Sequence, residues 1–407
     1  MELFLFDSYS IDATKTVLSF FYQAGTDRFE EKLFLPKPLP DSVDKDMLDK
    51  LLFNLHLALG VSYWKMKCIP RMEIKSGTLT SPQAQFWNLI YTKGLGEFYY
   101  RNNIDFRNLV AFPYTTSEPM SPKTLTFLKR ELVGIGGGKD SVVTWERLKK
   151  EKITAVGLII ETQKKYDSVN ELLQVGDIPV LRVRREMDTK LIEYKNNSFY
   201  HNGHIPISMI YAWIGIFTAV VYDYRAFVVS NEKSADEGNT QMYGVAINHQ
   251  WSKSKEFEDA FSRYIHTNIS PSVSYYSPLR NMTELEIVKE FISHPKYRAV
   301  VSSCNRNFSV TNALHNKRWC GQCPKCAFAF LLFAAYLPKK EVISLFGKNM
   351  LEDPSLLGLF LALQGKRGMK PFECVGTFEE VQEAMKMIEK KKEFVLPKEL
   401  QMTNHQS

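Results

Sequence analysis

A run of glycines followed by a lysine, an aspartate and a serine marks the point where an apolar stretch gives way to an amphipathic one. The run is Gly136-Gly137-Gly138-Lys139-Asp140-Ser141, directly after a strand expected over 132–135. Glycines let backbone N–H groups approach a polyphosphate closely, and the N-terminus of a following helix favours its negative charge. The segment therefore predicts a binding site for the phosphates of a nucleotide.

Two common nucleotide-binding motifs are excluded by spacing. A Walker loop would need glycine in place of Val133 and Ser or Thr in place of Asp140, and a dinucleotide fingerprint starting at Gly134 would need glycine in place of Lys139. The segment instead resembles the PP-loop, Ser-Gly-Gly-x-Asp-Ser, of ATP pyrophosphatases, which split ATP into AMP and pyrophosphate. Gly136 stands where that loop usually has its first serine, so one hydroxyl contact is missing. A glycine-rich turn without a ligand is the alternative for this segment taken alone.

Four cysteines in the last third of the chain predict a metal site. Cys320, Cys323 and Cys326 form a Cys-x-x-Cys-x-x-Cys run, and Cys304 lies upstream at the end of a strand expected over 298–303. Structural zinc takes four soft ligands in a tetrahedron, and a run of this kind supplies three from one tight turn. Buried cysteines without a metal and a redox pair are the alternatives, but neither requires this spacing of four thiols. We expect structural Zn²⁺.

Composition is that of a large protein of two or three domains, at about 100 to 200 residues each. The formal net charge of +7 is spread along 407 residues, so it does not demand nucleic acid. The apolar start, 1–6, lacks a basic leader, and the densest apolar run, 327–337, is too short to span a bilayer. We expect a cytoplasmic enzyme with a small-molecule substrate and no nucleic-acid or membrane partner; the sequence does not indicate the oligomeric state.

Apolar and amphipathic segments alternate after residue 130. Strands are expected over 132–135, 153–160, 179–183 and 226–230, with helices over 140–150, 167–174 and 207–222 between them. Such alternation predicts an α/β fold whose parallel sheet is covered on both faces and binds ligands at the carboxyl ends of its strands. With the loop above, it predicts a PP-loop domain of the adenine nucleotide alpha hydrolase-like type.

The rest of the chain is divided by composition. Strands over 3–6, 16–22 and 32–35 with a helix over 45–59 predict an α+β domain spanning 1–120, which carries no motif that we can interpret. The ATP-binding PP-loop domain is expected over 121–300, and a cysteine-rich, zinc-binding and helical region over 301–407.

Two polar segments follow the strand expected over 226–230, where an open α/β sheet places its active site. The first begins with Asn231 and Glu232, which we expect to contact the nucleotide. The second contains His249, Lys253 and Lys255, which are able to bind phosphate or move protons, although an exposed loop leading into a helix over 257–265 is an even alternative. His201 and His204 have metal-ligand spacing, but they flank Asn202-Gly203, which predicts a hairpin turn instead.

Together with the cysteine run and the tail Lys370-Pro-Phe-Glu-Cys-Val-Gly-Thr377, these segments resemble the MurL family, the UDP-N-acetylmuramoyl-L-alanyl-L-glutamate epimerases of peptidoglycan synthesis. The resemblance covers roughly residues 130–380. It implies that ATP transfers AMP to the α-carboxylate of the terminal L-glutamate, with release of pyrophosphate, because the α proton beside an ionised carboxylate is too weakly acidic to remove. The mixed anhydride then acts as an electron sink, so that a base takes the proton and it returns to the opposite face.

The resemblance also implies roles for individual residues. Gly136, Gly137, Gly138, Lys139 and Ser141 would hold the polyphosphate, and Asp140 would act on it through Mg²⁺. His249 is the first candidate for proton transfer and Cys374 the second. Lys253, Lys255 and Arg306 would bind the UDP-muramoyl dipeptide. No step requires pyridoxal phosphate.

A PP-loop followed by a cysteine run also resembles the 7-cyano-7-deazaguanine synthases, and other relatives adenylate and modify tRNA. Such enzymes would use the same adenylation to attach nitrogen or sulfur. A protein that senses a nucleotide without catalysis is a third hypothesis. Release of pyrophosphate separates it from both enzyme classes, and the second substrate separates the enzymes from each other.

Overall fold

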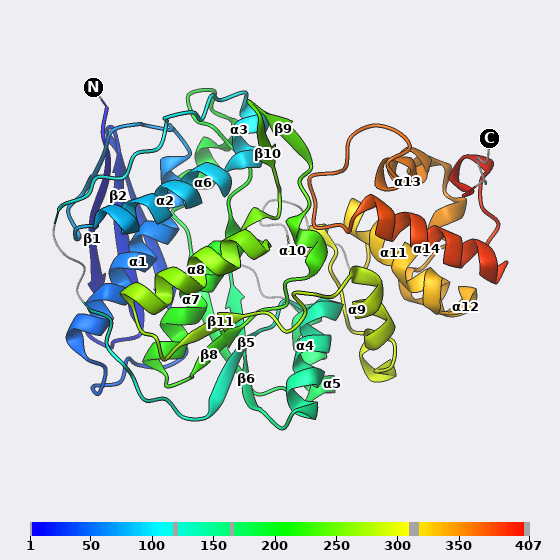
Figure 1. Ribbon diagram of the computed structural model, residues 1–407, viewed down its shortest axis with the longest axis horizontal. Helices are drawn as coiled ribbons and strands as arrows, with labels where there is room; N and C mark the ends of the chain where they lie inside the picture. Colours follow the sequence, from blue (N-terminus) through cyan, green and yellow to red (C-terminus); the bar gives the residue numbers. More distant parts are fainter. Residues whose placement is uncertain (1, 117–120, 163–166, 309–316, 403–407) are drawn as a thin grey trace.

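The computed structural model describes residues 2–116, 121–162, 167–308 and 317–402 (Figure 1). A nine-stranded sheet runs through the molecule in the order β11-β8-β5-β6-β7-β3-β2-β1-β4. Its parallel half consists of β5 (Arg130–Gly134), β6 (Thr154–Glu161), β7 (Val180–Glu186), β8 (Ala226–Val228) and β11 (Ser274–Tyr276). The predicted α/β class is confirmed.

The N-terminal strands extend this same sheet. Strands β1 (Phe4–Ile11), β2 (Val17–Ala24) and β3 (Asp27–Phe34) are antiparallel to one another, β4 (Met72–Ile74) is parallel to β1, and β3 pairs antiparallel with β7. A buried ion pair between Glu31 and Arg185, 2.6 Å, joins β3 to β7. Among the described residues no separate sheet lies before residue 120, and the predicted domain boundaries remain predictions.

Helices cover both faces of the parallel strands. Leu132 and Phe227 belong to one apolar core, whereas their neighbours Val133 and Val228 belong to another. Strands buried on both faces need apolar residues at every position, which explains the continuous apolar runs in the sequence. The first core includes α1 (Lys45–Trp64), α2 (Ser81–Lys93), α7 (Ile207–Val221) and α8 (Lys255–Asn268), and the second includes α4 (Lys139–Lys150), α5 (Asp167–Gly176) and α9 (Glu284–Phe291).

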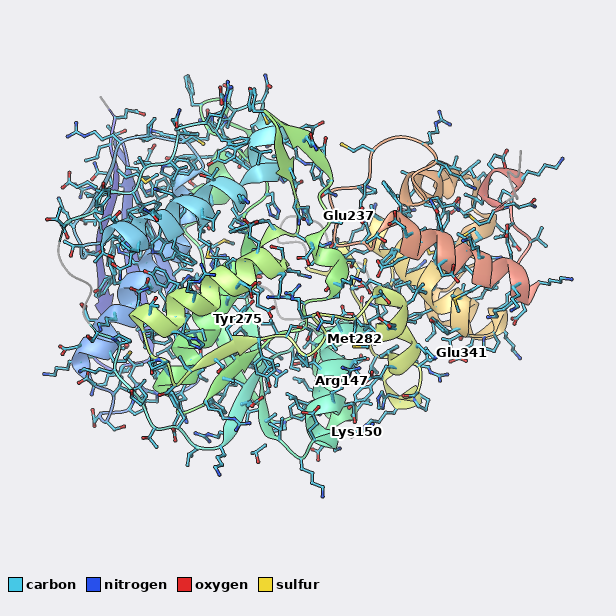
Figure 2. The ribbon with its side chains drawn as sticks, in the orientation of Figure 1. Arg147, Lys150, Glu237, Tyr275, Met282 and Glu341 are labelled. Atoms are coloured by element: carbon cyan, nitrogen blue, oxygen red, sulfur yellow. The ribbon has the colours of Figure 1, made fainter. Side chains whose placement is uncertain are left out.

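The C-terminal helices form a lobe beside α9 (Figure 1). They are α11 (Pro324–Tyr336), α12 (Lys339–Phe346), α13 (Leu357–Leu363) and α14 (Phe378–Lys391). Two contacts fix this side of the molecule: Arg147 of α4 binds Glu290 of α9 at 2.6 Å, and Glu341 of α12 accepts from Arg298 at 2.8 Å. Figure 2 labels Arg147 and Glu341. None of the helices in the described ranges has the length and apolar character needed to cross a bilayer.

The strand expected over 298–303 is wrong. This segment makes no strand pairing, because its backbone groups bond elsewhere: the Ser302 N–H donates to the Gly137 carbonyl at 3.0 Å, and the Arg318 guanidinium donates to the Val300 carbonyl at 2.6 Å. The segment therefore packs against the glycine-rich loop and delivers Ser303 and Cys304 next to it.

Candidate active site

The sheet has a topological switch point between β5 and β8. From β5 the chain proceeds to β6 and β7 on one side, and later to β8 and β11 on the other. Ligands of open α/β sheets bind in the crevice at the carboxyl ends of the two strands that flank such a point. Strand β5 leads into Gly136–Gly138 and β8 leads into Asn231 and Glu232, so this point unites two of the predicted segments.

The glycine-rich loop has the backbone of an anion cradle. Gly137 has φ +84°, a region that L side chains rarely adopt, and Gly138 is the N-cap of α4 without any side-chain capping bond. A Cβ built on Gly136 would meet no atom within 4 Å, so open space lies before the loop. The Ser141 hydroxyl donates to the Gly138 carbonyl at 2.9 Å and holds the first turn. The N-terminus of α4 thus faces open space with uncapped N–H groups, which suits a phosphate.

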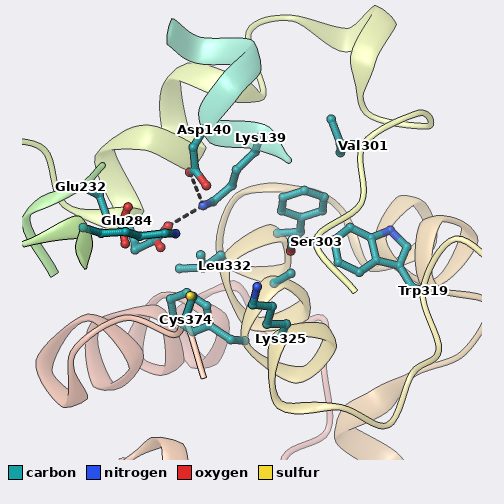
Figure 3. A pocket seen from close by; sticks show the side chains of 14 residues that line it. Lys139, Asp140, Glu232, Glu284, Val301, Ser303, Trp319, Lys325, Leu332 and Cys374 are labelled. Atoms are coloured by element: carbon teal, nitrogen blue, oxygen red, sulfur yellow. Dashed lines mark hydrogen bonds and ion pairs between the residues drawn. The ribbon is translucent and has the colours of Figure 1, made fainter. Parts of the chain in front are cut away.

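One cavity gathers five of the predicted site residues: Lys139, Asp140, Glu232, Lys253 and Cys374 (Figure 3). Glu284, Ser303 and Lys325 also line it, together with an apolar wall that includes Trp319 and Leu332. The lining comes from segments as far apart in the chain as α4 and the stretch before α14. A cavity that joins the switch point to the C-terminal lobe is therefore the candidate active site.

Acidic side chains dominate the loop side of this cavity. The Lys139 ammonium lies 2.6 Å from Asp140 and 2.5 Å from Glu284. Burial raises the pKa of Glu284 to about 8, and the neighbouring Asp140 and Glu232 carboxylates add to the rise against the opposing effect of Lys139. Three carboxyl groups line this side of the cavity, and the Lys139 ammonium pairs with two of them, Asp140 and Glu284. Their oxygens are ligands of the kind that a hard divalent cation takes.

A thiol, an imidazole and a carboxylate form a chain on the opposite side. His249 bonds through Nδ1 to Glu97 of α3 (Gly96–Asn102), and it also hydrogen-bonds Cys374. Glu97 is 5% exposed and accepts a second bond from Arg101 at 2.5 Å. Burial lowers the pKa of His249, but the bonds to Cys374 and Glu97 outweigh it and raise that pKa to about 9. His249 is therefore an imidazolium at neutral pH.

The Cys374 thiol is ionised in this setting. Burial raises the pKa of Cys374, but the positive charges of Lys253 and then Lys325, with the hydrogen bond from His249, lower it to about 6. The thiolate in turn is the largest cause that holds the pKa of Lys253 above its usual range. At neutral pH the site therefore contains a thiolate surrounded by three cations.

The tail that carries Cys374 is fixed by polar contacts. The Asn239 side chain accepts from the backbone N–H of His249 at 2.9 Å and donates to the Pro371 carbonyl at 3.0 Å. One residue thus positions both the loop that carries His249 and the tail that carries Cys374. Lys370 binds Glu237 at 2.9 Å. A Cβ on Gly376 would lie 2.4 Å from Glu380 Oε2 and 2.7 Å from Cζ of Phe328, so a larger residue would force these side chains to shift.

Some predicted residues lie outside the cavity. Lys255 is about half exposed and pairs with Asp259, and Arg306 is exposed on α10 (Asn305–Phe308). Asn231 is buried behind Glu232 and donates to the Tyr275 hydroxyl at 3.5 Å. Substrate binding by Lys255 and Arg306 remains a prediction.

The hairpin expected around His201 and His204 is wrong, because no strand flanks the turn. His204 instead enters the site: its Nδ1 lies 3.4 Å from Glu97 Oε2, and its ring centroid is 4.6 Å from that of His249. Burial and the charge of His249 lower the pKa of His204 to about 3, so it stays neutral. Sequence reasoning missed Glu97, His204, Glu284 and Lys325. Only the histidine spacing gave a signal, and it was interpreted as a turn.

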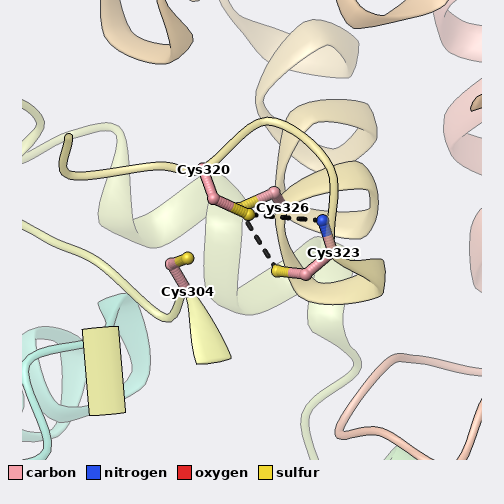
Figure 4. A group of neighbouring side chains, drawn as sticks. All are labelled: Cys304, Cys320, Cys323 and Cys326. Atoms are coloured by element: carbon pink, nitrogen blue, oxygen red, sulfur yellow. Dashed lines mark hydrogen bonds between the residues drawn. The ribbon is translucent and has the colours of Figure 1, made fainter. Parts of the chain in front are cut away.

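The four predicted cysteines meet at one point (Figure 4). The sulfurs of Cys304, Cys320, Cys323 and Cys326 lie within 4.8 Å of one another, and none is in a disulfide. Cys326 lies 3.4 Å from Cys323 and 3.6 Å from Cys320, sulfur to sulfur. A tetrahedral site with metal–sulfur bonds of about 2.3 Å needs sulfurs about 3.8 Å apart. The cluster is therefore able to hold a metal ion.

Two family models match the chain. The MurL N-terminal domain matches residues 1–278, and the MurL C-terminal domain matches residues 300–405. The first contains Glu97, the glycine-rich loop, His249 and Lys253, and the second contains Lys325, Cys374 and the cysteine cluster.

Three relatives with the name UDP-N-acetyl-alpha-D-muramoyl-L-alanyl-L-glutamate epimerase are similar over most of the chain. The protein from Xanthomonas oryzae pv. oryzae is 36% identical over 84% of this chain and 74% of its own length. The protein from Micromonospora sp. is 35% identical over 95% of this chain and 87% of its own, and the one from Salinispora tropica is 34% identical over 95% and 85%. The cavity residues thus fall within the ranges that the two family models match, except Glu284, which lies between them.

Proposed function

This chain belongs to the MurL epimerase family, and on that premise we propose that it converts the terminal L-glutamate of UDP-MurNAc-L-Ala-L-Glu to D-glutamate in the synthesis of peptidoglycan precursors. The reaction uses ATP, passes through an acyl-adenylate, and releases AMP and pyrophosphate. One observation supports this chemistry most directly: a glycine-rich helix N-terminus and an ionised thiol bonded to an imidazolium face the same cavity.

ATP binding is supported by the fit of the loop to a polyphosphate. The loop has uncapped N–H groups, a left-handed glycine at Gly137 and open space before Gly136. The acidic side chains Asp140, Glu232 and Glu284 would repel ATP alone, but they fit Mg²⁺ as oxygen ligands. Mg²⁺ held by these carboxyl groups would supply positive charge against the charge that develops on the leaving pyrophosphate.

The other side of the cavity suits the glutamyl substrate. Lys253 and Lys325 offer two positive charges where an ionised α-carboxylate would approach the α-phosphorus of ATP. Once that carboxylate is adenylated, its α proton becomes acidic enough for exchange. His249, bonded to Cys374, carries a proton at neutral pH and serves as the proton carrier at the α carbon.

The cysteine cluster is proposed to hold structural Zn²⁺. All four ligands are thiols, which leaves no position for water or substrate, and such closed sites stabilise folds. Nitrogen or sulfur transfer of the deazaguanine-synthase type receives no support from the relatives, whose names all describe the epimerase.

The test is a reaction in heavy water with ATP, Mg²⁺ and UDP-MurNAc-L-Ala-L-Glu. We expect AMP, and D-glutamyl product that carries deuterium at the α carbon, because the proton removed is exchanged with solvent. Omitting ATP should stop both. Consumption of ATP without α-deuterium would contradict the epimerase reaction, and exchange without ATP would contradict the adenylate.

A further inference from the structure

Cys374 is placed as a group that reacts and not only as part of the cavity wall. Figure 3 shows its sulfur directed into the cavity, on the side facing Glu284 and Lys139, with Lys325 beside it. The tail residues around it are tied down by Asn239 and by the ion pair of Lys370 with Glu237. A sulfur held this firmly beside the glycine-rich loop lies where an adenylated carboxyl would form.

The groups behind the sulfur have the order of an activated nucleophile. His249 bonds Cys374 on one side and Glu97 on the other, and Glu97 is buried and fixed by Arg101. A nucleophile, a base within hydrogen-bond reach and a third group that orients the base are the arrangement of covalent acyl transfer. The neutral His204 ring packs against His249 and adds no competing charge.

The charges facing the sulfur favour the same role. The positive groups Lys253, Lys325 and His249 surround Cys374, whereas the carboxylates Glu232 and Glu284 line the same cavity from the loop side. These cations would also attract the carboxyl group of the substrate. Sulfur and acyl carbon are thereby brought to one place.

We propose that Cys374 attacks the adenylated α-carboxyl and carries the glutamyl residue as a thioester while its α carbon is epimerised; this deepens the proposed function and rests on it. The sulfur–carbon bond forms as the bond between the acyl carbon and the AMP oxygen breaks, and AMP leaves with the electron pair. After proton exchange, water attacks the thioester carbon, the carbon–sulfur bond breaks with its electron pair going to sulfur, and the thiolate returns together with the D-glutamyl carboxylate and two protons, one of which restores the imidazolium of His249.

A thioester keeps the α proton acidic after AMP has left, because sulfur donates little electron density to the carbonyl. It also frees His249. In the resting site the thiolate helps to hold the proton on this imidazole. Acylation removes that negative charge, so His249 gives up its proton more readily beside the α carbon.

The experiment follows covalent protein and adenylation separately. Full-length protein is mixed with ATP, Mg²⁺ and substrate labelled with carbon-14 in its glutamate, stopped with acid over a rapid time course, and analysed as intact protein and as peptides. We expect label on the peptide containing Cys374, stable to acid and released by neutral hydroxylamine. Substrate-dependent exchange between ATP and pyrophosphate reports adenylation in the same samples.

Variants decide the role of the sulfur. Cys374→Ala should carry no label and lose at least about a hundredfold in epimerisation, yet keep pyrophosphate exchange. Cys68→Ala is the matched control. Cys68 is buried just after the end of α1 and is far from Cys374 in the chain, so this variant should behave as wild type. Cys374→Ser, which preserves shape, should be folded and label weakly or not at all.

The contrary outcomes are distinct. Unlabelled wild-type protein with normal pyrophosphate exchange would mean that Cys374 acts only as a base or not at all, and it would overturn the thioester. So would Cys374→Ala with wild-type epimerisation. No pyrophosphate exchange in the wild type would remove the adenylate, and both proposals with it.

Discussion

Replacing Lys253 with methionine tests whether the cavity ionises Cys374. The side chain of Lys253 is the largest of the causes that lower the pKa of this thiol. Methionine has nearly the same length but no charge, so it should preserve packing while removing the interaction. We expect the pKa of Cys374 to rise in Lys253→Met, and the thiolate therefore to appear only at higher pH.

The size of the effect follows from the shift in the wild type. A fall of the pKa from 9.0 to about 6 corresponds to about 4 kcal/mol in favour of the thiolate, at about 1.4 kcal/mol per unit. Three cations produce it against the cost of burial. Lys253 is the largest of these favourable contributions, which together also overcome the cost of burial, so its loss should raise the pKa by at least about one unit. The thiolate should then be half formed at about pH 7 or above instead of near pH 6.

The assay is the rate of alkylation of Cys374 by iodoacetamide between pH 4.5 and 9.5, followed on its peptide by mass spectrometry. The midpoint of this profile reports the pKa, whereas the plateau rate also changes with the nucleophilicity of the thiolate. In the wild type the rate should be high above pH 6 and fall as pH drops below it. Lys255→Met is the matched control, because Lys255 pairs with Asp259 on the surface, and its midpoint should not move. A wild-type midpoint near 9, or an unchanged midpoint in Lys253→Met, would refute the ionised thiol.

Four other outcomes are expected. Asp140→Ala should reduce AMP formation by about two orders of magnitude or more, with an unchanged circular dichroism spectrum, because we propose that its carboxylate acts on the phosphates through a cation; full activity would contradict this. Purified protein should contain about one zinc per chain by atomic emission, and Cys323→Ser should lose both the metal and several degrees of Tm. His249→Asn should cut epimerisation by about two to four orders of magnitude while pyrophosphate exchange persists. Gly376→Ala should lower the free energy of unfolding in urea by about 1–3 kcal/mol, whereas Gly358→Ala, whose added Cβ meets nothing within 4 Å, should not.

The elements of the parallel half could be predicted because their signals are local. Expected and observed bounds agree closely for the strand at 132–135, which is β5, and for the helix at 140–150, which is α4. A strand buried on both faces must be apolar throughout, and a phosphate loop must be rich in glycine. Each requirement leaves a pattern within a few adjacent residues.

No such local pattern in the sequence indicates that the N-terminal strands join this sheet. Strand β3 alternates like any half-buried strand, and its sequence does not specify β7, which follows about 150 residues later, as its neighbour. The same limit applies to Glu97 and Glu284. Each is an ordinary acidic residue on a helix, and only long-range packing brings it to the site.

Two neighbouring lysines differ in a way that the sequence pattern did not predict. Lys253 and Lys255 are two residues apart and received the same prediction, but Ser254 caps α8 between them. The helix begins at Lys255 and turns that side chain toward Asp259, whereas Lys253 closes a 3₁₀ turn whose carbonyl is held by Arg280 at 2.7 Å. One capping hydroxyl thus separates a residue of the site from a residue of the surface.

The cysteine cluster and the cavity are connected through neighbouring residues in the chain. Ser303, Trp319 and Lys325 all line the cavity, and each is adjacent in sequence to a cysteine of the cluster. Lys325 lies in the first turn of α11, directly after the loop that holds Cys320 and Cys323. A metal bound by these cysteines would therefore also hold Lys325 in its place in the cavity wall. The proposed zinc site would in this way support one of the positive charges that lower the pKa of Cys374.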